Sequence, residues 1–207
     1  MQKTLTVEEY RALREGVEIV ANDPFGDKVL RLENGNYLKL FRVKRFVSFA
    51  RFWSYSRRFA YNARRLADLD IIVPEIFEIC RISSIRRSGV IYKPLEGMTL
   101  RDIGSTLDEE TILNLGSLYK QLHEKGIYHR SLHLGNVVLN SNKELGLIDI
   151  ADLSIYWGRL PKRLRIRNFR HLSRYEEHRR TIAVHCDAFV EGLKGLDELY
   201  VRKLFVN

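Results

Sequence analysis

Residues 128–139, which read YHRSLHLGNVVL, constrain this chain more than any other stretch. A polar turn in it carries Ser131 and Asn136, and the apolar run VVL follows directly. A second apolar run, at 146–150, contains Asp149 and is separated from the first by the turn NSNK. Short apolar runs bounded by turn residues are typical of strands. The pattern predicts a polar loop followed by two short strands, the second of which carries Asp149.

The first part of the chain is rich in strand signals. A short helix is expected over residues 4–13, with Thr6 as its N-cap and Glu9 completing a capping box. Three β-rich runs follow, separated by the turns NDPFG and ENGN, at 17–20, 28–32 and 36–41. The Asn-Gly pair at 34–35 is a strong hairpin signal. Together these features predict an antiparallel meander.

A long basic and aromatic helix is expected over residues 48–69. Its apolar side chains recur at helical spacing, at Phe52, Tyr55, Phe59, Leu66 and Leu69. We interpret this stripe as core rather than as a platform on which nucleic-acid bases stack. Two further strands are expected at 72–79 and 89–94, and a compact turn over 96–100 leads into a helix.

The remainder of the chain is mostly helical in pattern. Residues 106–125 are predicted to form a helix that Thr106 caps, that Glu109 supports through a capping box and that Gly126 ends. After the loop and its two strands, residues 154–163 read as a loop and the chain is expected to be helical from 165 onward. Strands with one helix, followed by mostly helix, predict a two-lobed α+β arrangement with a cleft between the lobes.

The composition favours a globular protein, since 45% of the 207 residues are hydrophobic and 29% are charged. The two cysteines, Cys80 and Cys186, lie far apart and form no CxxC pair, so we expect buried thiols in a reduced compartment. Charges interrupt the N-terminal stretch, and the sequence has no run of eighteen apolar residues. We therefore expect neither export by a cleaved signal nor a membrane span.

The net charge of +9 is unevenly distributed. Residues 42–65 contain eight Lys or Arg and no acid, and residues 159–180 contain nine bases against Glu176 and Glu177. Such segments favour an anionic partner, which the charge alone leaves open as a phosphorylated sugar, an acidic lipid or a nucleic acid. Two solvated helical faces are the alternative.

The spacing of His129, Ser131, Asn136 and Asp149 is that of a phosphoryl-transfer catalytic loop and its metal-binding strand. The chain resembles the protein-kinase-like superfamily and, within it, the bacterial lipopolysaccharide kinase family of Kdo and heptose kinases and toluene-tolerance proteins. HEKGIYHRSLHLGNVVL is similar to the family's LHxxGxxHxDLHxxNxLL, and LIDIAD to its LIDxD. The basic segment RLPKRLRIRNFRHLSRY is also similar, so the resemblance covers nearly the whole chain.

This resemblance implies a single kinase-like domain. Residues 1–94 would form a small N-lobe, with an antiparallel sheet and one long helix, and residues 95–207 a helical C-lobe with the catalytic loop and metal strand. It implies ATP and Mg²⁺ as cofactors, with Asn136 and Asp149 as the metal ligands.

The resemblance also assigns roles to residues outside the metal pair. Lys39, on the opposite strand face from its neighbours in YLKLF, would grip the α- and β-phosphates. His129 would brace the loop's backbone. The hinge would lie near Tyr92 to Glu96, where backbone groups meet adenine.

Three positions depart from the family pattern. Ser131 stands where the Asp that accepts the substrate proton is expected, and Asn62 stands at the place of the helix glutamate that pairs with the strand lysine. The phosphate-covering turn has only Gly26. Because general-base help is worth about 10²- to 10⁴-fold, loss of the Asp predicts a slow kinase rather than a dead one. Asp152 is a candidate stand-in for the base, with a structural role as the alternative.

Two smaller alternatives concern side chains near these positions. Asp68 or another acid is a candidate to compensate for Asn62. His133 reads either as a metal ligand or base or as a histidine that stabilises the loop, and the second interpretation is favoured.

The leading hypothesis is phosphoryl transfer from ATP to a sugar hydroxyl of the lipopolysaccharide core, or to another anionic sugar. We expect the protein in the cytoplasm, with peripheral contact at the inner face of the inner membrane. The alternative is a pseudokinase that acts as a nucleotide-binding scaffold or regulator in envelope biogenesis. A nucleic-acid-binding domain rests only on charge and aromatic content and is disfavoured.

Overall fold

The computed structural model describes residues 2–42 and 54–206. The chain divides into two compact units, Met1–Pro94 and Leu95–Asn207. Strands and helices occur in both units, which confirms the predicted α+β class. Within the described residues, no helix is both long and apolar enough to span a bilayer.

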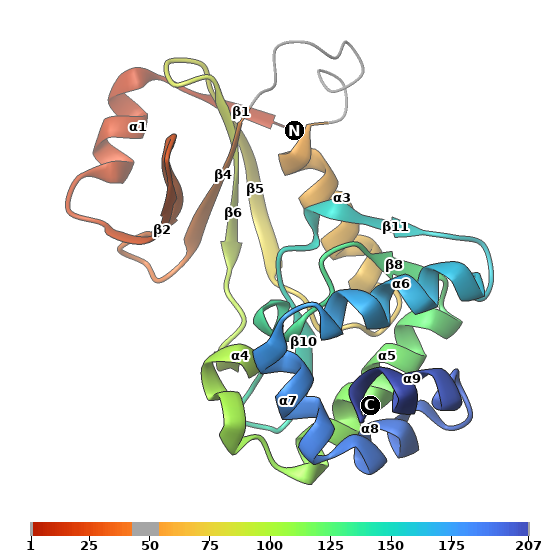
Figure 1. Cartoon of the computed structure of the whole chain (residues 1–207). Coiled ribbons are helices and arrows are strands. Elements are labelled where there is room, and N and C mark those ends of the chain that lie inside the picture. Colours follow the sequence, from red (N-terminus) through yellow and green to blue (C-terminus); the bar gives the residue numbers. More distant parts are fainter. Residues whose placement is uncertain (1, 43–53, 207) are drawn as a thin grey trace. The chain divides into compact units, whose positions relative to one another are not determined.

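A six-stranded sheet forms the body of the first unit, in the order β1-β5-β6-β4-β3-β2 (Figure 1). Its strands are β1 (Gln2–Leu5), β2 (Glu18–Asp23), β3 (Gly26–Arg31), β4 (Tyr37–Arg42), β5 (Glu75–Ile82) and β6 (Arg87–Lys93). The predicted meander is confirmed, because β2, β3 and β4 pair in antiparallel fashion. In the turn before β4, the Asn34 side chain accepts the N–H of Asn36 at 3.1 Å.

The prediction of an all-antiparallel sheet is wrong at one edge, where β1 runs parallel to β5. The expected helix over 4–13 accordingly begins later, as α1 (Val7–Arg14). Its capping box is confirmed: the Thr6 hydroxyl accepts the Glu9 N–H at 3.1 Å, and the Glu9 carboxylate accepts the Thr6 N–H at 2.8 Å. Residues 2–5 carry no local strand signal, since their partner strand lies far along the chain.

Helix α3 (Tyr55–Ala67) packs against β4, β5 and β6. It begins after Ser54, whose hydroxyl accepts the Arg57 N–H at 3.4 Å, and the remaining predicted helical residues at 48–53 lie outside the described part of the chain. Phe59 and Leu66 are buried, which confirms these two as core.

A second core lies on the other side of the sheet. Leu38 and Leu40 of β4 pack there with Tyr10 of α1 and with Cys80 of β5. Because side chains alternate along a strand, β4 is buried on both of its faces. This is why Lys39, between two core leucines, is also buried.

Both cysteines are free and buried, as predicted. Burial raises the pKa of the Cys80 thiol to about 11 and also raises the pKa of the Cys186 thiol above its usual value. Neither thiol therefore carries the thiolate character that cysteine reactivity requires.

The second unit contains two small sheets, β10-β9-β7 and β11-β8, among its helices. Its strands are β7 (Met98–Thr99), β8 (Ile127–His129), β9 (Val137–Leu139), β10 (Leu145–Leu147) and β11 (Leu153–Ile155). Its helices are α4 (Leu100–Ile103), α5 (Glu109–Glu124), α6 (Lys162–Ser173), α7 (Glu176–Val184), α8 (Cys186–Leu193) and α9 (Glu198–Phe205). Three 3₁₀ turns complete it, η1 (Gly104–Thr106), η2 (Leu134–Asn136) and η3 (Ile150–Asp152).

The predicted cap of α5 is wrong by two residues. Asp108 is the N-cap, and its carboxylate accepts the Thr111 N–H at 2.8 Å. Thr106 instead ends η1, and its hydroxyl donates to the Ile103 carbonyl at 3.0 Å. Leu107 is buried in extended conformation between them, so the helix cannot begin earlier. Gly126, with φ of 72°, ends the helix as predicted.

Helices α5 and α8 approach closely because each has a glycine at the crossing. A Cβ on Gly116 would lie 2.2 Å from the Phe189 carbonyl oxygen, and one on Gly192 would lie 2.2 Å from that of Leu113. The close crossing lets Tyr119 reach Phe189, whose ring centroid lies 5.6 Å away. The core of the second unit is built around this crossing.

Replacing Gly116 by valine is therefore expected to destabilise the protein by about 2 kcal/mol, because the helix backbones must move apart. Thermal unfolding of the variant and of wild type measures the loss, expected as a decrease of several degrees. Glu191→Val, at an exposed position of α8, is the matched control and is expected to change little. An unchanged unfolding temperature for Gly116→Val would contradict the close crossing.

Candidate functional site

The two short strands after the loop bring Asn136 and Asp149 to one end of a hairpin. Val137 of β9 pairs with Leu147 of β10, so the residues just beyond them, Asn136 and Ile148, also face each other. The Ile148 N–H donates to the Asn136 carbonyl at 3.0 Å. Asp149 is the next residue, and it therefore lies beside the loop that Asn136 ends.

The Asn136 side chain holds the loop in shape. Its Nδ2 donates to the Ser131 carbonyl at 2.8 Å, and its own N–H donates to the His133 carbonyl at 2.9 Å. The side chain is 7% exposed. Because Nδ2 is committed to Ser131, the amide is oriented and Oδ1 is the atom that remains as an acceptor or a metal ligand.

Asp149 has a left-handed backbone, with φ of 55° and ψ of 43°. Aspartate adopts this region more readily than most residues, but such positions occur preferentially at functional sites. Asp149 precedes η3 without capping it through its side chain. An amide oxygen and a carboxylate form a hard donor set of the kind that Mg²⁺ prefers, so the residues present fit this cation.

His129 supports the backbone of the loop through a hydrogen bond. The side chain is 1% exposed, and its Nδ1 accepts the Ser131 N–H at 3.2 Å. Burial lowers its pKa to about 4, although the charge of Asp149 and the Ile148 backbone act in the opposite direction. His129 is therefore neutral at physiological pH and serves as an acceptor for the loop.

Asp152 and Arg130 form an ion pair beside Ser131, with an Arg130 Nη1 to Asp152 Oδ2 distance of 3.4 Å. The Arg130 N–H also approaches the Asp152 carbonyl at 3.3 Å. These contacts join the start of the loop to η3. They support the structural interpretation of Asp152 over its role as a substitute base.

His133 stabilises the turn into η2, which agrees with the favoured interpretation of this residue. Its Nδ1 accepts the Gly135 N–H at 3.1 Å and also faces Arg101 Nη2 at 3.4 Å. The ring stacks on His171 with centroids 5.6 Å apart. Burial and the charge of Arg101 lower the pKa of His133 to about 4, so it is neutral in this arrangement.

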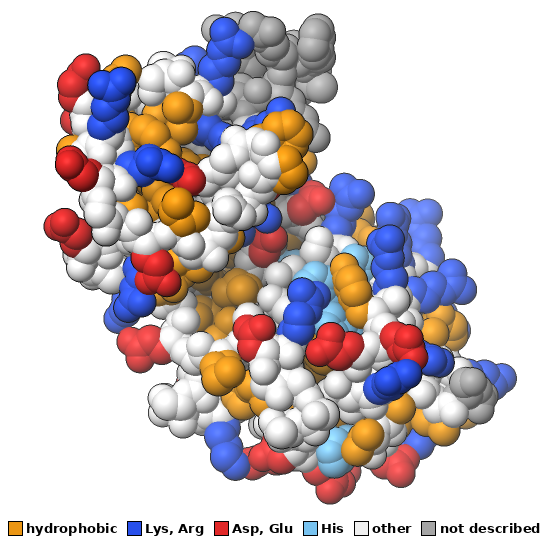
Figure 2. Space-filling model, turned by 60° about the vertical axis from the view of Figure 1, so that its left-hand side comes forward, with side chains coloured by type: hydrophobic (Ala, Val, Ile, Leu, Met, Phe, Trp, Pro, Cys, Tyr) orange, Lys and Arg blue, Asp and Glu red, His pale blue; other side chains and the backbone are white. Residues whose placement is uncertain are grey.

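Arg101 is a residue of this region that the sequence patterns did not single out. Its Nε donates to His178 Nε2 at 3.2 Å, and its guanidinium lies 5.4 Å from the centre of the Tyr175 ring. Figure 2 shows histidine side chains grouped on this face of the second unit. Arg101 therefore links α4 and α7 to His133.

Asn168 is the second residue that the sequence patterns missed. Its Nδ2 donates to the His129 carbonyl at 2.7 Å, and its Oδ1 lies 3.2 Å from His123 Nε2. It is fully buried between Phe169 and Arg165, on the inward face of α6. The sequence signal that could have identified Asn168 is a polar side chain on the apolar side of a helix.

The remaining predicted residues lie in other parts of the chain. Lys39 is buried in the first unit, where its Nζ lies 5.4 Å from the centre of the Phe59 ring of α3. Asn62, one turn further along α3, is also buried. Asp68 is exposed at the end of α3, 3.9 Å from Arg65, and so does not replace the missing glutamate.

The two residues predicted at the hinge differ in environment. The Tyr92 ring packs within the first unit against Tyr37 and Phe59, with centroids 5.9 and 5.6 Å away. Glu96 is exposed in the second unit. The Tyr92 side chain thus belongs to the core, and only its backbone remains as a candidate contact for adenine.

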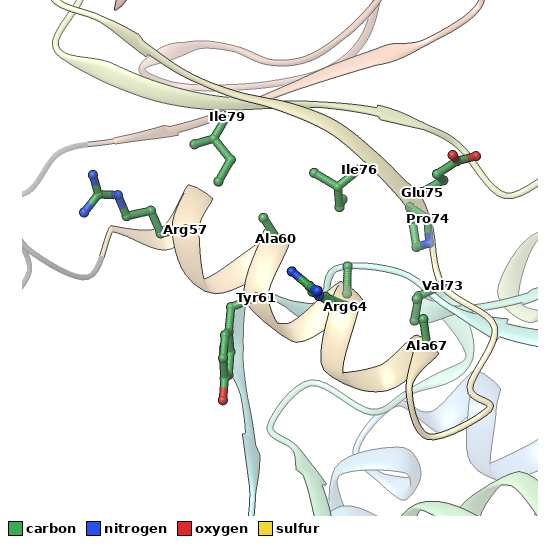
Figure 3. A pocket seen from close by; sticks show the side chains of 11 residues that line it. Arg57, Ala60, Tyr61, Arg64, Ala67, Val73, Pro74, Glu75, Ile76 and Ile79 are labelled. Carbon is green, nitrogen blue, oxygen red and sulfur yellow. The ribbon is translucent and has the colours of Figure 1, made fainter. Parts of the chain in front are cut away.

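A cavity of about 820 Å³ lies elsewhere in the first unit, between α3 and β5 (Figure 3). Apolar side chains of both elements line it, among them Ala60, Ala67, Ile76 and Ile79. None of the predicted site residues is in its lining. We interpret it as the seam between a helix rich in alanine and the sheet, and not as the site.

The Asn136 amide thus lies in a loop beside the strand-end carboxylate of Asp149, and a neutral histidine, His129, supports that loop. Residues 56–192 match the lipopolysaccharide kinase (Kdo/WaaP) family. This match covers more than half of the chain, which belongs to that family. Comparison with curated proteins gave no match.

Membership in the family indicates the class of activity. It indicates a kinase that acts on lipopolysaccharide, and therefore a transferase with a sugar substrate of the lipopolysaccharide core. Membership in a kinase family implies that ATP is used, usually together with Mg²⁺.

The buried histidine next to Asn168 predicts a fall in stability at acidic pH. Burial lowers the pKa of His123 to about 4 from an ordinary value of 6.5. As the pH falls, the unfolded chain therefore binds a proton at His123 before the folded chain does. The contribution of the neutral His123 to the free energy of unfolding is complete above pH 6.5 and is lost between pH 6.5 and 4. The expected loss from this residue is roughly 3 kcal/mol.

Denaturant unfolding at several pH values measures this effect. His123→Gln is expected to flatten the slope of unfolding free energy against pH between 6.5 and 4, whatever its effect on stability at pH 7. His185→Gln, at a half-buried position between α7 and α8, is the control that is expected to keep the wild-type slope. An unchanged slope in His123→Gln would contradict the assignment.

Proposed function

We propose that this protein binds ATP with Mg²⁺ and transfers the γ-phosphoryl group to a sugar hydroxyl of the lipopolysaccharide core, at a rate reduced by Ser131. The observation that carries the proposal is the oriented Asn136 amide beside Asp149. In the proposed site, the Asn136 Oδ1 and the Asp149 carboxylate hold the metal. The cation, when bound, neutralises the charge that develops on the phosphates.

The other residues act on binding and orientation. Lys39 grips the α- and β-phosphates, and the backbone near Tyr92 and Glu96 contacts adenine. His129 holds the Ser131 N–H, and so fixes where the Ser131 hydroxyl is presented. That hydroxyl is unionised near neutral pH, so it can hydrogen-bond a substrate hydroxyl but cannot take its proton.

The magnitude of the defect follows from the chemistry of the reaction. Phosphoryl transfer passes through a loose transition state, in which positioning and charge neutralisation supply most of the acceleration. Loss of the general base lowers the rate by about 10²- to 10⁴-fold and leaves positioning and charge neutralisation in place. The expected activity is thus slow but measurable.

Restoring the acid tests this account of Ser131. Ser131→Asp is expected to raise the rate of phosphate transfer by about 10²-fold or more, because it supplies the missing proton acceptor. The measurement is transfer of labelled phosphate from ATP to lipopolysaccharide core acceptors. Ser131→Ala is the matched control and is expected to stay near the wild-type rate. No activity in any of the three proteins, across a panel of acceptors, would contradict the proposal that the protein is a slow kinase.

Nucleotide binding tests the metal pair separately from catalysis. Wild type with Mg²⁺ is expected to show a higher unfolding temperature when ATP is added. Asp149→Asn is expected to lose most of this shift, because it removes the only carboxylate of the proposed pair. Asp152→Asn is the matched control, and its shift is expected to persist. Wild type without any shift would overturn the proposed function.

The alternative is a pseudokinase that works as a nucleotide-binding scaffold or regulator in envelope biogenesis. Two residues favour it, Ser131 in place of the base and Asn62 in place of the helix glutamate. Binding of ATP by wild type, together with no transfer by Ser131→Asp, would select this function over the kinase.

A further inference from the structure

A fully exposed tryptophan stands in the loop between β11 and α6. Trp157 is 103% exposed, and the adjacent Tyr156 is 42% exposed. The loop lies at the outer edge of the second unit in the view of Figure 1, between the strand labelled β11 and the helix labelled α6. The two exposed aromatic side chains make this part of the loop amphipathic, since each ring is apolar and carries one polar group.

The loop that carries Trp157 is fixed at both ends. The Tyr156 N–H donates to the Gly126 carbonyl at 2.9 Å, and the Leu160 N–H donates to the His123 carbonyl at 2.7 Å. A Cβ on Gly126 would lie only 2.3 Å from the Gly158 carbonyl oxygen, so the glycine permits the loop to pass close. Leu160 is fully buried just after the exposed residues. Trp157 is thus presented by an anchored loop.

A row of arginines begins six residues later on the outward face of α6. Arg163, Arg167, Arg170 and Arg174 are spaced by four, three and four residues and are all exposed. At 100° per residue they fall on one side of the helix, over about 16 Å of its length. The opposite side is buried, at Arg165, Asn168, Phe169 and Leu172.

The charge of this row is not balanced on the helix. Helix α6 contains no acidic residue. In the part of the chain that the structure describes, Arg163, Arg167 and Arg174 form no ion pair with a carboxylate. Arg165, by contrast, faces inward and pairs with Asp197 at 2.7 Å. The structure therefore distinguishes the inward Arg165 from four exposed arginines, of which Arg170 also donates its Nε to the Tyr200 hydroxyl at 2.8 Å.

We propose that Trp157 and the outward arginine row of α6 form a surface that docks on an anionic lipid bilayer. Tryptophan prefers the level of the headgroups, where its ring is partly buried and its N–H remains hydrated. A row of arginines attracts an anionic membrane surface and binds lipid phosphates through paired N–H donors. The combination of an aromatic anchor and a cationic helix face is what an interfacial membrane-binding element requires.

This inference deepens the proposed function, since an acceptor sugar on a lipid is reached at the membrane. The two are nevertheless separable by experiment. Vesicle binding needs neither ATP nor Mg²⁺, and Asp149→Asn is expected to bind vesicles as wild type does. Loss of nucleotide binding with retained vesicle binding would remove the proposed function and leave the docking surface in place.

Co-sedimentation with vesicles tests the surface. Wild type is expected to bind vesicles that contain phosphatidylglycerol and not vesicles of phosphatidylcholine alone. Arg163→Gln with Arg167→Gln is expected to weaken binding by roughly 10- to 30-fold, since each basic residue near an anionic membrane contributes about a factor of five. Trp157→Ala is expected to weaken it several-fold at unchanged charge. Circular dichroism establishes that each variant is folded.

The matched control has the same loss of charge elsewhere on the second unit. Arg179→Gln with Arg180→Gln removes two exposed arginines from α7 and is expected to bind almost as wild type does. Equal weakening by both pairs would show a diffuse attraction and overturn the proposal, as would absence of binding to the anionic vesicles.

Tryptophan fluorescence gives a second readout of the same surface. The chain has two tryptophans, so Trp53→Phe leaves Trp157 as the only one. Its emission is expected to shift to shorter wavelength when phosphatidylglycerol vesicles are added. Bound protein whose emission stays at the wavelength of a fully hydrated tryptophan would exclude Trp157 from the contact.

Discussion

The hydrogen bond from Asn136 Nδ2 to the Ser131 carbonyl is the contact on which the candidate site depends. It closes the loop over five residues and orients the amide. The backbone bond from Ile148 to Asn136 then places Asp149 next to that amide. Two hard oxygen donors thus stand at one end of a short hairpin, and this geometry needs no catalytic acid at position 131.

Support for this contact comes from buried polar groups around it. The His129 Nδ1 accepts the Ser131 N–H, and the Asn168 Nδ2 donates to the His129 backbone carbonyl. His133 and Arg101 fix the far end of the loop. Buried polar groups of this kind specify one conformation, because each would cost free energy if its partner were lost. The loop is therefore rigid in shape even though one chemical group in it has changed.

Much of the site was predictable because its signals are local. The spacing of His129, Asn136 and Asp149 along the chain, with the apolar runs around them, was enough to place the loop and its strands. The capping box at Thr6 and the turn at Gly126 were predictable for the same reason. Each depends on residues within a few positions of one another.

The missed features depend on partners far along the chain. Residues 2–5 form strand β1 because they pair with β5, and the sequence of these residues alone does not indicate that pairing. Asn168 and Arg101 contribute through contacts with His129 and His133, which lie more than thirty residues away. Lys39 is buried because a helix covers its face of the sheet, whereas alternation along the strand shows only that it faces away from the leucines.

The most direct test of the central claim is a crystal structure of the protein with a non-hydrolysable ATP analogue and Mn²⁺ in place of Mg²⁺. The anomalous signal of manganese locates the cation without reference to any expected position. The account predicts a cation bonded directly to the Asn136 Oδ1 and to the Asp149 carboxylate. A nucleotide bound with its cation on other residues, or crystals without nucleotide at saturating concentration, would contradict it.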